Sequence, residues 1–255
     1  MNTPRVLFIL VSWIYFVTNL SAQTTQVIAH RGFWNTEGAA QNSLAALYKA
    51  DSIQCYGSEF DVHLTADKQL VVNHDDSFKG VKIRKASATE CTRLTLSNGE
   101  TLPTLHQYLK LGKELNTKLI LELKRLSSPE DETLAVEKIV HMVREMNLEN
   151  RMEYISFSKH AVQEFIRLAP ANTPVYYLEG DASPQELKEW GCAGADYHIS
   201  VFRKHPEWIQ ELHLLGMKVN VWTVNKAKDM QWLIEQGVDY ITTNEPRLLY
   251  QLLTN

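Results

Sequence analysis

Acidic side chains recur within short apolar runs in the first half of the chain. Glu59 and Asp61 lie two residues apart in one run, and Glu122 lies in another. Residues two apart on a strand point to the same face, so Glu59 and Asp61 would present their carboxylates together. Three clustered carboxylates repel one another and favour a hard divalent cation between them, Ca²⁺ or Mg²⁺ rather than zinc. The pattern predicts such a metal site; the alternative is a set of ion pairs with Arg31 and Lys124.

Two histidines are placed next to this acidic cluster. His30 ends an apolar run, and His74 follows a run that a short turn joins to the run of Asp61. A pair of imidazoles can donate a proton to a leaving alkoxide and accept one from an attacking hydroxyl, as displacement at phosphorus requires. Arg31 and Lys124 supply cations for phosphate oxygens. Together these residues predict chemistry at a phosphate ester.

Apolar runs alternate with segments of helical periodicity after residue 25, and such alternation predicts parallel strands joined by helices. Nine runs have the length and composition of strands: 27–30, 56–62, 70–73, 119–123, 152–157, 174–178, 195–198, 218–222 and 240–242. Helical patterns between them cover 42–53, 104–116, 132–146, 160–168, 207–215 and 226–236.

The third run does not fit the alternation. Too few residues separate it from the second run for a parallel crossover, so these two runs are expected to form a hairpin. A turn centred on Asp67 and Lys68 would place His74 roughly opposite Asp61. His63 could share the face of Asp61 and is a weaker third candidate.

Without the arm of the hairpin eight strands remain, the number in a (β/α)8 barrel, or TIM barrel. The expected fold is therefore α/β, with active-site residues at the carboxyl ends of the strands, where a charged group on a buried strand is least costly. Residues 76–102 have no clear period and are expected to form a small insertion after strand 2. A chain of 255 residues, 44% of them hydrophobic, suits one barrel domain over 23–255.

The charge balance argues against a nucleic-acid partner. The chain has 26 basic and 30 acidic residues, for a net charge of -4, and so offers no basic platform for a phosphate backbone. The expected partner is a small molecule. Cys55, Cys91 and Cys192 are odd in number and do not have zinc-site spacing, so we expect buried free thiols.

The N-terminal residues differ in composition from the rest. An almost wholly apolar stretch, 6–20, follows a basic residue and precedes the small residues Ser21 and Ala22. The stretch falls short of the roughly 20 residues that cross a bilayer. Residues 1–22 are therefore expected to be a cleaved signal peptide rather than a membrane anchor. The mature chain is expected to be exported, periplasmic or secreted, with no stable membrane anchor.

Several motifs, in a fixed order, resemble those of the glycerophosphodiester phosphodiesterase family, which has the TIM-barrel fold. They are IAHRG at 28–32, QNS at 41–43, EFDV at 59–62, VVNHD at 71–75, PTL at 103–105, LELK at 121–124, VWTVN at 221–225 and TTNEP at 242–246. The motifs span nearly the whole mature chain. A lone His-Arg-Gly would be a weak signal, but the ordered set is specific.

The resemblance implies a divalent metal site on Glu59, Asp61 and Glu122, with His30 and His74 as the acid and base. It also implies the substrate, a deacylated phospholipid that is split into glycerol 3-phosphate and an alcohol. The residues are compatible with direct attack by water and with attack by the neighbouring glycerol hydroxyl through a cyclic phosphodiester.

Trp222 would line the pocket in the pattern of the family, beside Arg31 and Lys124 on the phosphate; its alternative role is to fill the barrel. The chain departs from the family at two positions. Gln41 stands where the family usually has Glu, and Asn244 where it tends to have Asp. Both changes remove negative charge near the barrel mouth, where the alcohol of the substrate would lie.

Two other functions are compatible with this fold. A phospholipase D-like enzyme that acts on a lysophospholipid or sphingolipid head group would need a wide apolar entrance for acyl chains. A non-catalytic barrel that binds a phosphate ligand would have no need of two histidines and three carboxylates. Their presence together favours an enzyme.

Overall fold

The structure is a computed structural model that describes residues 25–254. The predicted signal peptide, 1–22, lies outside the described residues. Across the described part of the chain, every helix is too short or too polar to span a membrane.

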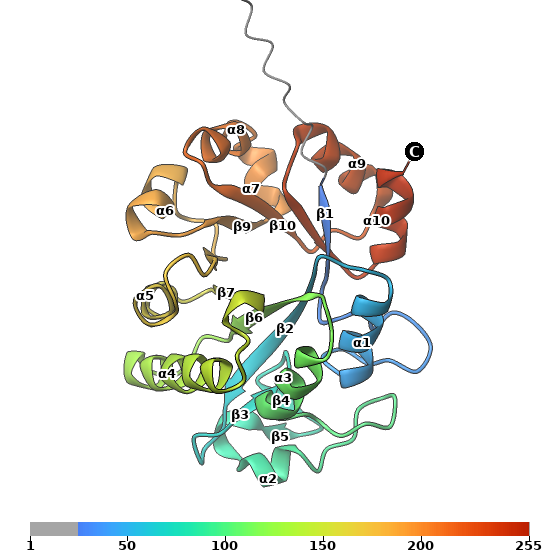
Figure 1. Ribbon diagram of the computed structural model, residues 1–255, viewed down its shortest axis with the longest axis vertical. Helices are drawn as coiled ribbons and strands as arrows, with labels where there is room; N and C mark the ends of the chain where they lie inside the picture. The colour runs from blue at the N-terminus through green and yellow to red at the C-terminus, as the bar shows by residue number, and fades with distance from the viewer. Residues whose placement is uncertain (1–24, 255) are drawn as a thin grey trace, which may run out of the picture.

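A sheet that closes on itself forms the barrel (Figure 1). Nine strands belong to the sheet, and β1 closes it by pairing with both β2 and β11. Only β3 (Leu70–Val72) is antiparallel, and it lies outside the ring. The ring consists of β1 (Gln26–Ala29), β2 (Gly57–Leu64), β6 (Lys118–Leu123), β7 (Met152–Ser156), β8 (Val175–Tyr177), β9 (Gly194–His198), β10 (Lys218–Trp222) and β11 (Tyr240–Thr243). The predicted (β/α)8 barrel is confirmed.

Helices follow the strands and surround the ring (Figure 1). They are α1 (Leu44–Ser52), α3 (Leu105–Lys113), α4 (Pro129–Glu145), α5 (Lys159–Leu168), α6 (Pro184–Trp190), α7 (Ile199–Lys204), α8 (Glu207–Leu214), α9 (Ala227–Gln236) and α10 (Pro246–Leu253), with a 3₁₀ turn η2 (Glu149–Arg151) before β7. Short polar side chains begin several helices; Ser128 accepts the N–H of Asp131 at the start of α4. α4 therefore begins at Pro129, before the predicted start at residue 132. The sequence pattern missed this first turn because the turn is polar and has no hydrophobic period.

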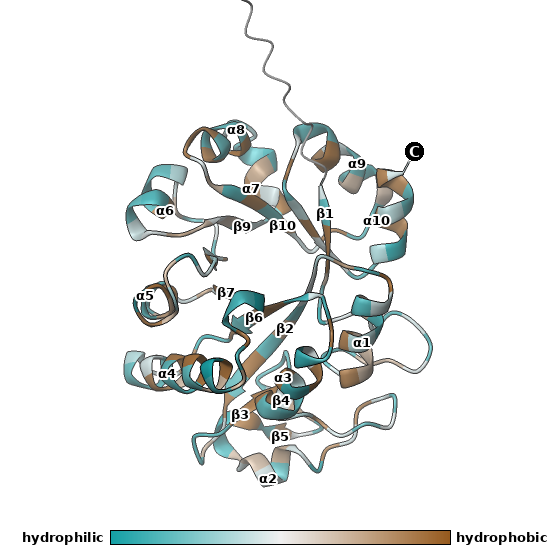
Figure 2. Cartoon of the chain, in the orientation of Figure 1, coloured by the Kyte–Doolittle hydropathy of each residue, from teal (hydrophilic) through white to brown (hydrophobic). Residues whose placement is uncertain are grey.

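Two layers of apolar side chains stabilise the barrel. The inner layer fills the ring with Ile28, Ile120, Ile155, Tyr176 and Leu178. A larger layer packs between the strands and the helices, and Figure 2 shows hydrophobic and hydrophilic residues mixed along helices such as α4 and α5. All three cysteines are buried and free, as expected. Because both faces of the strands are covered, charged groups inside the ring are stabilised only by partners or near the mouth.

The predicted hairpin between β2 and β3 is confirmed, with a register that differs by one residue. Asn73, not His74, lies opposite Asp61 and donates its backbone N–H to the Asp61 carbonyl at 3.0 Å. The turn centres on Asp67 alone, with Lys68 in the left-handed conformation at a φ of 57°. A turn with an odd number of residues shifts every partner after it by one position.

Residues 76–102 lie between β3 and α3. They contain β4 (Ser77–Phe78), β5 (Val81–Lys82), the 3₁₀ turn η1 (Ile83–Lys85) and α2 (Ala88–Cys91). Their apolar side chains, among them Ile83 and Leu102, form a small cluster with Val71 of β3. The segment therefore packs on the hairpin arm, at the bottom of Figure 1, rather than on the ring of strands.

Candidate active site

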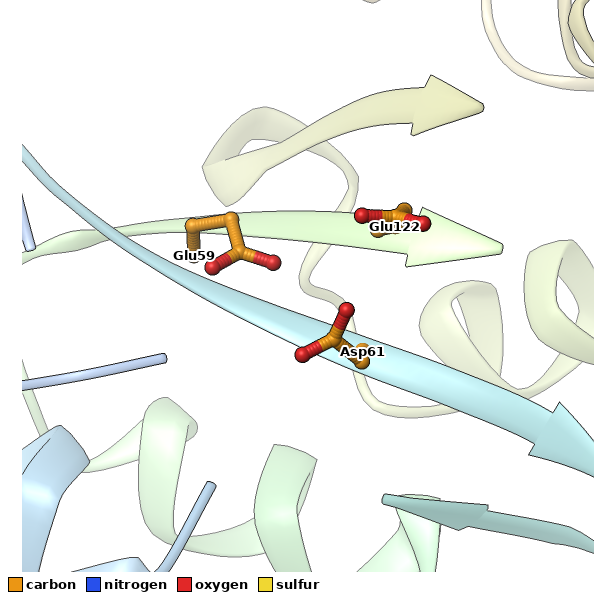
Figure 3. A group of neighbouring side chains, drawn as sticks. All are labelled: Glu59, Asp61 and Glu122. Atoms are coloured by element: carbon orange, nitrogen blue, oxygen red, sulfur yellow. The ribbon is translucent and has the colours of Figure 1, made fainter. Parts of the chain in front are cut away.

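Three carboxylates meet where β2 and β6 run side by side (Figure 3). Glu59 and Asp61 lie on β2, and Glu122 on β6 is the register partner of Asp61. One oxygen of each carboxylate lies within 4.8 Å of the other two. The three residues are buried, with relative exposures of 3%, 1% and 7%. The period of two along β2 and the parallel pairing with β6 together produce the cluster.

Two cations accompany the carboxylates. Lys124 Nζ lies 2.8 Å from Glu122 Oε1 and 3.3 Å from Asp61 Oδ1. Arg31 Nε lies 3.7 Å from Asp61 Oδ2. The carboxylate of Glu59 accepts the backbone N–H of Arg31 at 2.7 Å. The site therefore has both the carboxylate cluster and the ion pairs that were the alternative interpretation, with three acids against two bases.

The pKa values show that the cations of the chain do not balance this cluster. Burial, and then repulsion by Asp61 and Glu122, raises the pKa of Glu59 well above its usual value. Burial and Asp61 raise the pKa of Glu122 to about 7. Burial acts in the same direction on Asp61, but Lys124 and other neighbours lower the pKa of Asp61 below its usual value. A divalent cation among the carboxylates would relieve this repulsion.

The donor atoms of the cluster suit a hard cation. Carboxylate oxygens are the ligands that Ca²⁺ and Mg²⁺ prefer, and the group has neither a sulfur nor an imidazole ligand. Asn42 fixes one of the carboxylates, because its Nδ2 donates to Asp61 Oδ2 at 2.8 Å and its Oδ1 accepts the Asp61 N–H at 3.2 Å. Asn42 is buried with a φ of 60°, a left-handed conformation that asparagine tolerates well.

A tight turn after β1 carries Arg31 onto the carboxylates. Arg31 and Gly32 are both left-handed, with φ of 57° and 76°. Gly32 donates its N–H to the carbonyl of Glu59 at 3.1 Å. A Cβ on Gly32 would lie 2.7 Å from the backbone of Ala46 in α1, so only glycine fits. The close approach of α1 to this turn therefore positions Arg31 for its contacts with Glu59 and Asp61.

His30 has a defined tautomer. Its Nδ1 lies 2.8 Å from Asn244 Oδ1, and Trp34 Nε1 donates to the same oxygen at 3.1 Å. An indole N–H can only donate, so the shared atom must be the amide oxygen and Nδ1 of His30 must carry a hydrogen. This leaves Nε2 as the proton acceptor. Burial and Arg31 lower the pKa of His30 to about 4, so the ring is neutral at neutral pH.

His74 lines the same pocket as His30 in a more open position. Its side chain is 35% exposed, and its Nδ1 lies 2.7 Å from Asp75 Oδ1. The carbonyl of His74 lies 3.2 Å from Nε2 of His63. His63 is fully buried on β2 and holds the backbone of His74 rather than lining the pocket. A carboxylate beside an imidazole orients the ring and compensates its charge when it carries a second proton.

A pocket of about 510 Å³ opens beside the carboxylates. Among the residues predicted from the sequence, it is lined by His30, Arg31, Glu59, His74, Glu122 and Trp222. Trp222 also donates its Nε1 to the carbonyl of Asp196 at 2.9 Å, so it contributes both to the pocket wall and to the packing of the barrel. Asp61, which is 1% exposed, is not part of the pocket wall.

Two wider hollows adjoin this pocket. A groove of about 1390 Å³ shares His74 with it, and Trp34 and Phe78 belong to the walls of the groove. A second hollow of about 760 Å³ shares Glu122 with the pocket and is lined in part by Lys124. The catalytic candidates therefore stand where an enclosed pocket meets open grooves.

The two departures from the family pattern both lie at this mouth. Gln41 Oε1 accepts a hydrogen bond from Arg31 Nη1 at 2.6 Å. Asn244 Oδ1 accepts a hydrogen bond from Nδ1 of His30. Neither Gln41 nor Asn244 belongs to the carboxylate cluster. Gln41 places an uncharged amide beside Arg31, the candidate phosphate ligand, and Asn244 places one beside His30, a candidate for proton transfer.

Four further polar residues line the pocket although the sequence analysis did not name them as site residues. They are Asp196 on β9, Asn220 on β10, Thr223 directly after β10 and Thr242 on β11. A charged residue on a buried strand is costly, so the position of Asp196 within a predicted strand could have marked it as a site candidate. Asn220 is uncharged, and the pattern of the sequence has no comparable signal for it. Thr223 and Thr242 lie in the VWTVN and TTNEP motifs, which indicated their segments but not their place in the pocket wall.

The fold and the site define a barrel enzyme, with carboxylates and histidines at the mouth of a closed parallel ring. The model of the glycerophosphoryl diester phosphodiesterase family matches residues 30–248, and the chain belongs to that family. The predicted family, and the prediction of an enzyme of this class, are confirmed.

Solved and curated proteins support the same assignment. A glycerophosphodiester phosphodiesterase from Parabacteroides distasonis is 51% identical, with a TM-score of 0.89 over 91% of this chain and 98% of its own. The glycerophosphodiester phosphodiesterase of Caldanaerobacter subterraneus subsp. tengcongensis is 28% identical over 90% of this chain and 98% of its own. A phosphodiesterase from Oleispira antarctica, solved in complex with the product sn-glycerol-3-phosphate, is 25% identical, with a TM-score of 0.78 over 91% of this chain and 98% of its own.

Proposed function

We propose that this chain hydrolyses glycerophosphodiesters in a metal-dependent reaction that yields glycerol 3-phosphate and an alcohol. The proposal is carried by the buried, unbalanced carboxylate cluster, which shares one pocket with two histidines in a chain of this family. The complex of the Oleispira antarctica relative with sn-glycerol-3-phosphate supports the identity of the product.

Glu59, Asp61 and Glu122 would hold a Ca²⁺ or Mg²⁺ ion. When bound, such a cation polarises a phosphoryl oxygen and compensates the negative charge that develops on it. Arg31 lines the pocket and would bind a second phosphate oxygen. Lys124, beside Glu122 and Asp61, supports this arrangement from the adjoining hollow.

His30 acts as the general base in this mechanism. Asn244 holds its Nδ1–H, so Nε2 is free to accept a proton from the attacking hydroxyl. The neutral ring that follows from its lowered pKa is the form that a base requires. The attacking hydroxyl belongs either to water or to the glycerol itself, and the role of His30 is the same for both.

His74 acts as the general acid. It lies where the pocket meets the groove of about 1390 Å³, so an alcohol in the groove departs past His74 and takes its proton. Amide, hydroxyl and carboxylate side chains line this groove beside Trp34 and Phe78. A mixed polar lining suits a head group better than an acyl chain, which weighs against a phospholipase D-like activity.

A substrate panel tests the proposal. Purified protein is assayed with Ca²⁺ or Mg²⁺ on glycerophosphocholine, glycerophosphoethanolamine, lysophosphatidylcholine and sphingomyelin, and glycerol 3-phosphate and the free head group are measured separately. We expect glycerol 3-phosphate from the first two substrates and little turnover of the lipids, with Glu122→Gln as the inactive control. Turnover confined to the lipids would favour the phospholipase D-like alternative, and turnover of none would refute the proposal.

We further propose that residues 1–22 direct export and are then removed. The support is the basic residue, the apolar stretch and the small residues that follow it. Expression of the full chain in a bacterial host, followed by N-terminal sequencing of the periplasmic and secreted fractions, tests this. A mature protein beginning near Gln23 is expected, and a full-length chain retained in the cytoplasm would contradict it.

A further inference from the structure

The wall of the pocket opposite the carboxylates has a buried acid of its own. In the order of strands around the ring, β9 is four positions from β2 in either direction, so Asp196 faces the side that carries Glu59. Asp196 is 1% exposed, yet it lines the pocket together with Glu59 and Glu122. A carboxyl at this place is directed toward whatever occupies the pocket.

One oxygen of this acid is unused. Asp196 Oδ1 has no hydrogen-bond partner among residues 25–254. A buried polar atom without a partner destabilises the fold, so it needs a physical explanation, and a contact with a ligand is one such explanation. Burial raises the pKa of Asp196 to about 8, and a hydrogen bond with Asn220 only partly opposes this. The neutral acid has one O–H to donate and oxygens that can still accept.

The surroundings of Asp196 are rigid and mostly apolar. Its register partner Asn220 exchanges hydrogen bonds with Thr242 at 3.0 and 3.1 Å. Trp222 Nε1 donates to the carbonyl of Asp196 and ties the two strands together. Ile155 and other apolar side chains form the adjacent wall. The pocket therefore combines a hydrocarbon surface with one hydrogen-bonding end.

We propose that Asp196 is a specificity-determining residue that binds the terminal hydroxyl of the glycerol group. This inference rests on the proposed function. If the phosphate lies at Glu59, Glu122 and Arg31, the end of glycerol farthest from phosphorus reaches across the pocket toward β9. The CH and CH₂ groups of glycerol then contact the apolar wall, and its terminal hydroxyl meets Asp196.

Paired substrates test the inference. Glycerophosphocholine is compared with 2-hydroxypropyl phosphocholine, which lacks only the terminal hydroxyl and keeps the hydroxyl next to the phosphate. A site that hydrogen-bonds a substrate hydroxyl discriminates strongly against the analogue without it, so the wild type should favour glycerophosphocholine in kcat/KM by at least about tenfold. Asp196→Leu should bring this ratio close to one, and Asp196→Asn should restore part of it, because an amide also donates and accepts.

Glu153→Gln is the matched control. Glu153 is another buried carboxyl inside the ring, 3% exposed, but it bonds Tyr56 and does not line the pocket. Its variant should keep the wild-type ratio. An unchanged ratio in both Asp196 variants, or an equal fall in Glu153→Gln, would show that Asp196 only fills the barrel.

Binding measurements separate this inference from the proposed function. Calorimetry compares glycerol 3-phosphate with 1,2-propanediol 1-phosphate, which lacks the terminal hydroxyl, in the presence of Ca²⁺. Wild-type protein that hydrolyses neither diester would refute the proposed function, while a calorimetric preference that is lost in Asp196→Leu and only partly kept in Asp196→Asn would still support the inference. Equal affinity of the wild type for both phosphates would overturn it. Should Asp196→Leu fail to fold, Asp196→Asn carries both tests, with a preference below that of the wild type as the expected result.

Discussion

His30 and His74 have different hydrogen-bond partners, and this predicts different responses to the leaving group. His74→Ala should lower turnover of glycerophosphocholine by about 10²–10⁴, because choline leaves poorly without a proton. Much of that loss should be recovered on a nitrophenyl diester, since nitrophenolate departs without a proton. His30→Ala should be impaired on both substrates, because a base is still needed. Steady-state rates of both variants on both substrates measure this.

Calorimetry of calcium binding to both variants is the control. Both should bind calcium as the wild type does, because neither ring belongs to the carboxylate cluster. If His30→Ala, and not His74→Ala, recovers turnover on the nitrophenyl diester, His30 is the acid and His74 the base. Near-wild-type turnover of glycerophosphocholine by His74→Ala would exclude a catalytic role for His74.

The amide of Asn244 sets the tautomer of His30, and Asn244→Asp tests the role of the ring as the base. A carboxylate at Nδ1 stabilises the imidazolium, so the pKa of His30 should rise from about 4. The base must be neutral, so activity is lost as the pH falls through that pKa. The acidic limb of kcat/KM should therefore move to higher pH in the variant. Trp34→Phe removes the other hydrogen bond to Asn244 without adding charge, and should move the limb far less.

A limb that stays in place in Asn244→Asp would contradict the assignment of His30 as the base. The contact itself was beyond prediction from the sequence, because the two residues are 214 positions apart and meet only when β1 and β11 close the ring. Glu59 and Asp61, in contrast, could be placed together from the sequence because the period of a strand is local.

Among the elements, the turn between β1 and α1 depends on one glycine. Gly32→Ala adds a side chain in a left-handed conformation, which costs about 1–2 kcal/mol, and a clash with Ala46, which costs about 1–3 kcal/mol more. Gly80 has a φ of 81° but open space around its missing Cβ, so Gly80→Ala carries the first cost alone. Denaturant unfolding should show Gly32→Ala to be the less stable variant. Equal stabilities would contradict the close packing of α1 on the turn.

The order of elements could be predicted from the sequence because buried strands and amphipathic helices have different periods. The strand predicted at 218–222 is β10, with the same bounds. Details that depend on backbone dihedral angles could not be predicted. The hairpin register could be predicted only to within about one residue, because the conformation of Lys68 decides the length of the turn. The hydrogen bonds of Asn42 likewise follow from its left-handed backbone, which no hydrophobic pattern records.

For the whole molecule, the unbalanced cluster predicts that a cation stabilises the fold. The raised pKa values of Glu59 and Glu122 mean that the folded protein holds their protons more tightly than the unfolded chain. Without metal, the contribution of Glu122 to stability is full below the usual pKa of 4.5 and is lost as the pH rises through its pKa of about 7. The contribution of Glu59 is lost in the same direction, as the pH rises through its own raised pKa. Calcium at 100 times its Kd should add about 2.7 kcal/mol at neutral pH.

Thermal unfolding with chelator and with calcium, at pH 5 and at pH 7.5, measures this effect. The increase in Tm on adding calcium should be larger at the higher pH, where Glu122 has released its proton. Glu122→Gln, which removes one ligand, serves as the control and should show a smaller increase. A Tm that is independent of calcium at both pH values would contradict a metal site at the cluster.

The most direct test of the account is the release of glycerol 3-phosphate from glycerophosphocholine by protein freed of metal with a chelator. The cluster of Glu59, Asp61 and Glu122 is the only group of three or more metal-ligating side chains found in the described part of the chain. The account predicts that turnover falls to background in chelator and returns when Ca²⁺ or Mg²⁺ is added in excess. Undiminished release of glycerol 3-phosphate in chelator would contradict a metal-dependent phosphodiesterase.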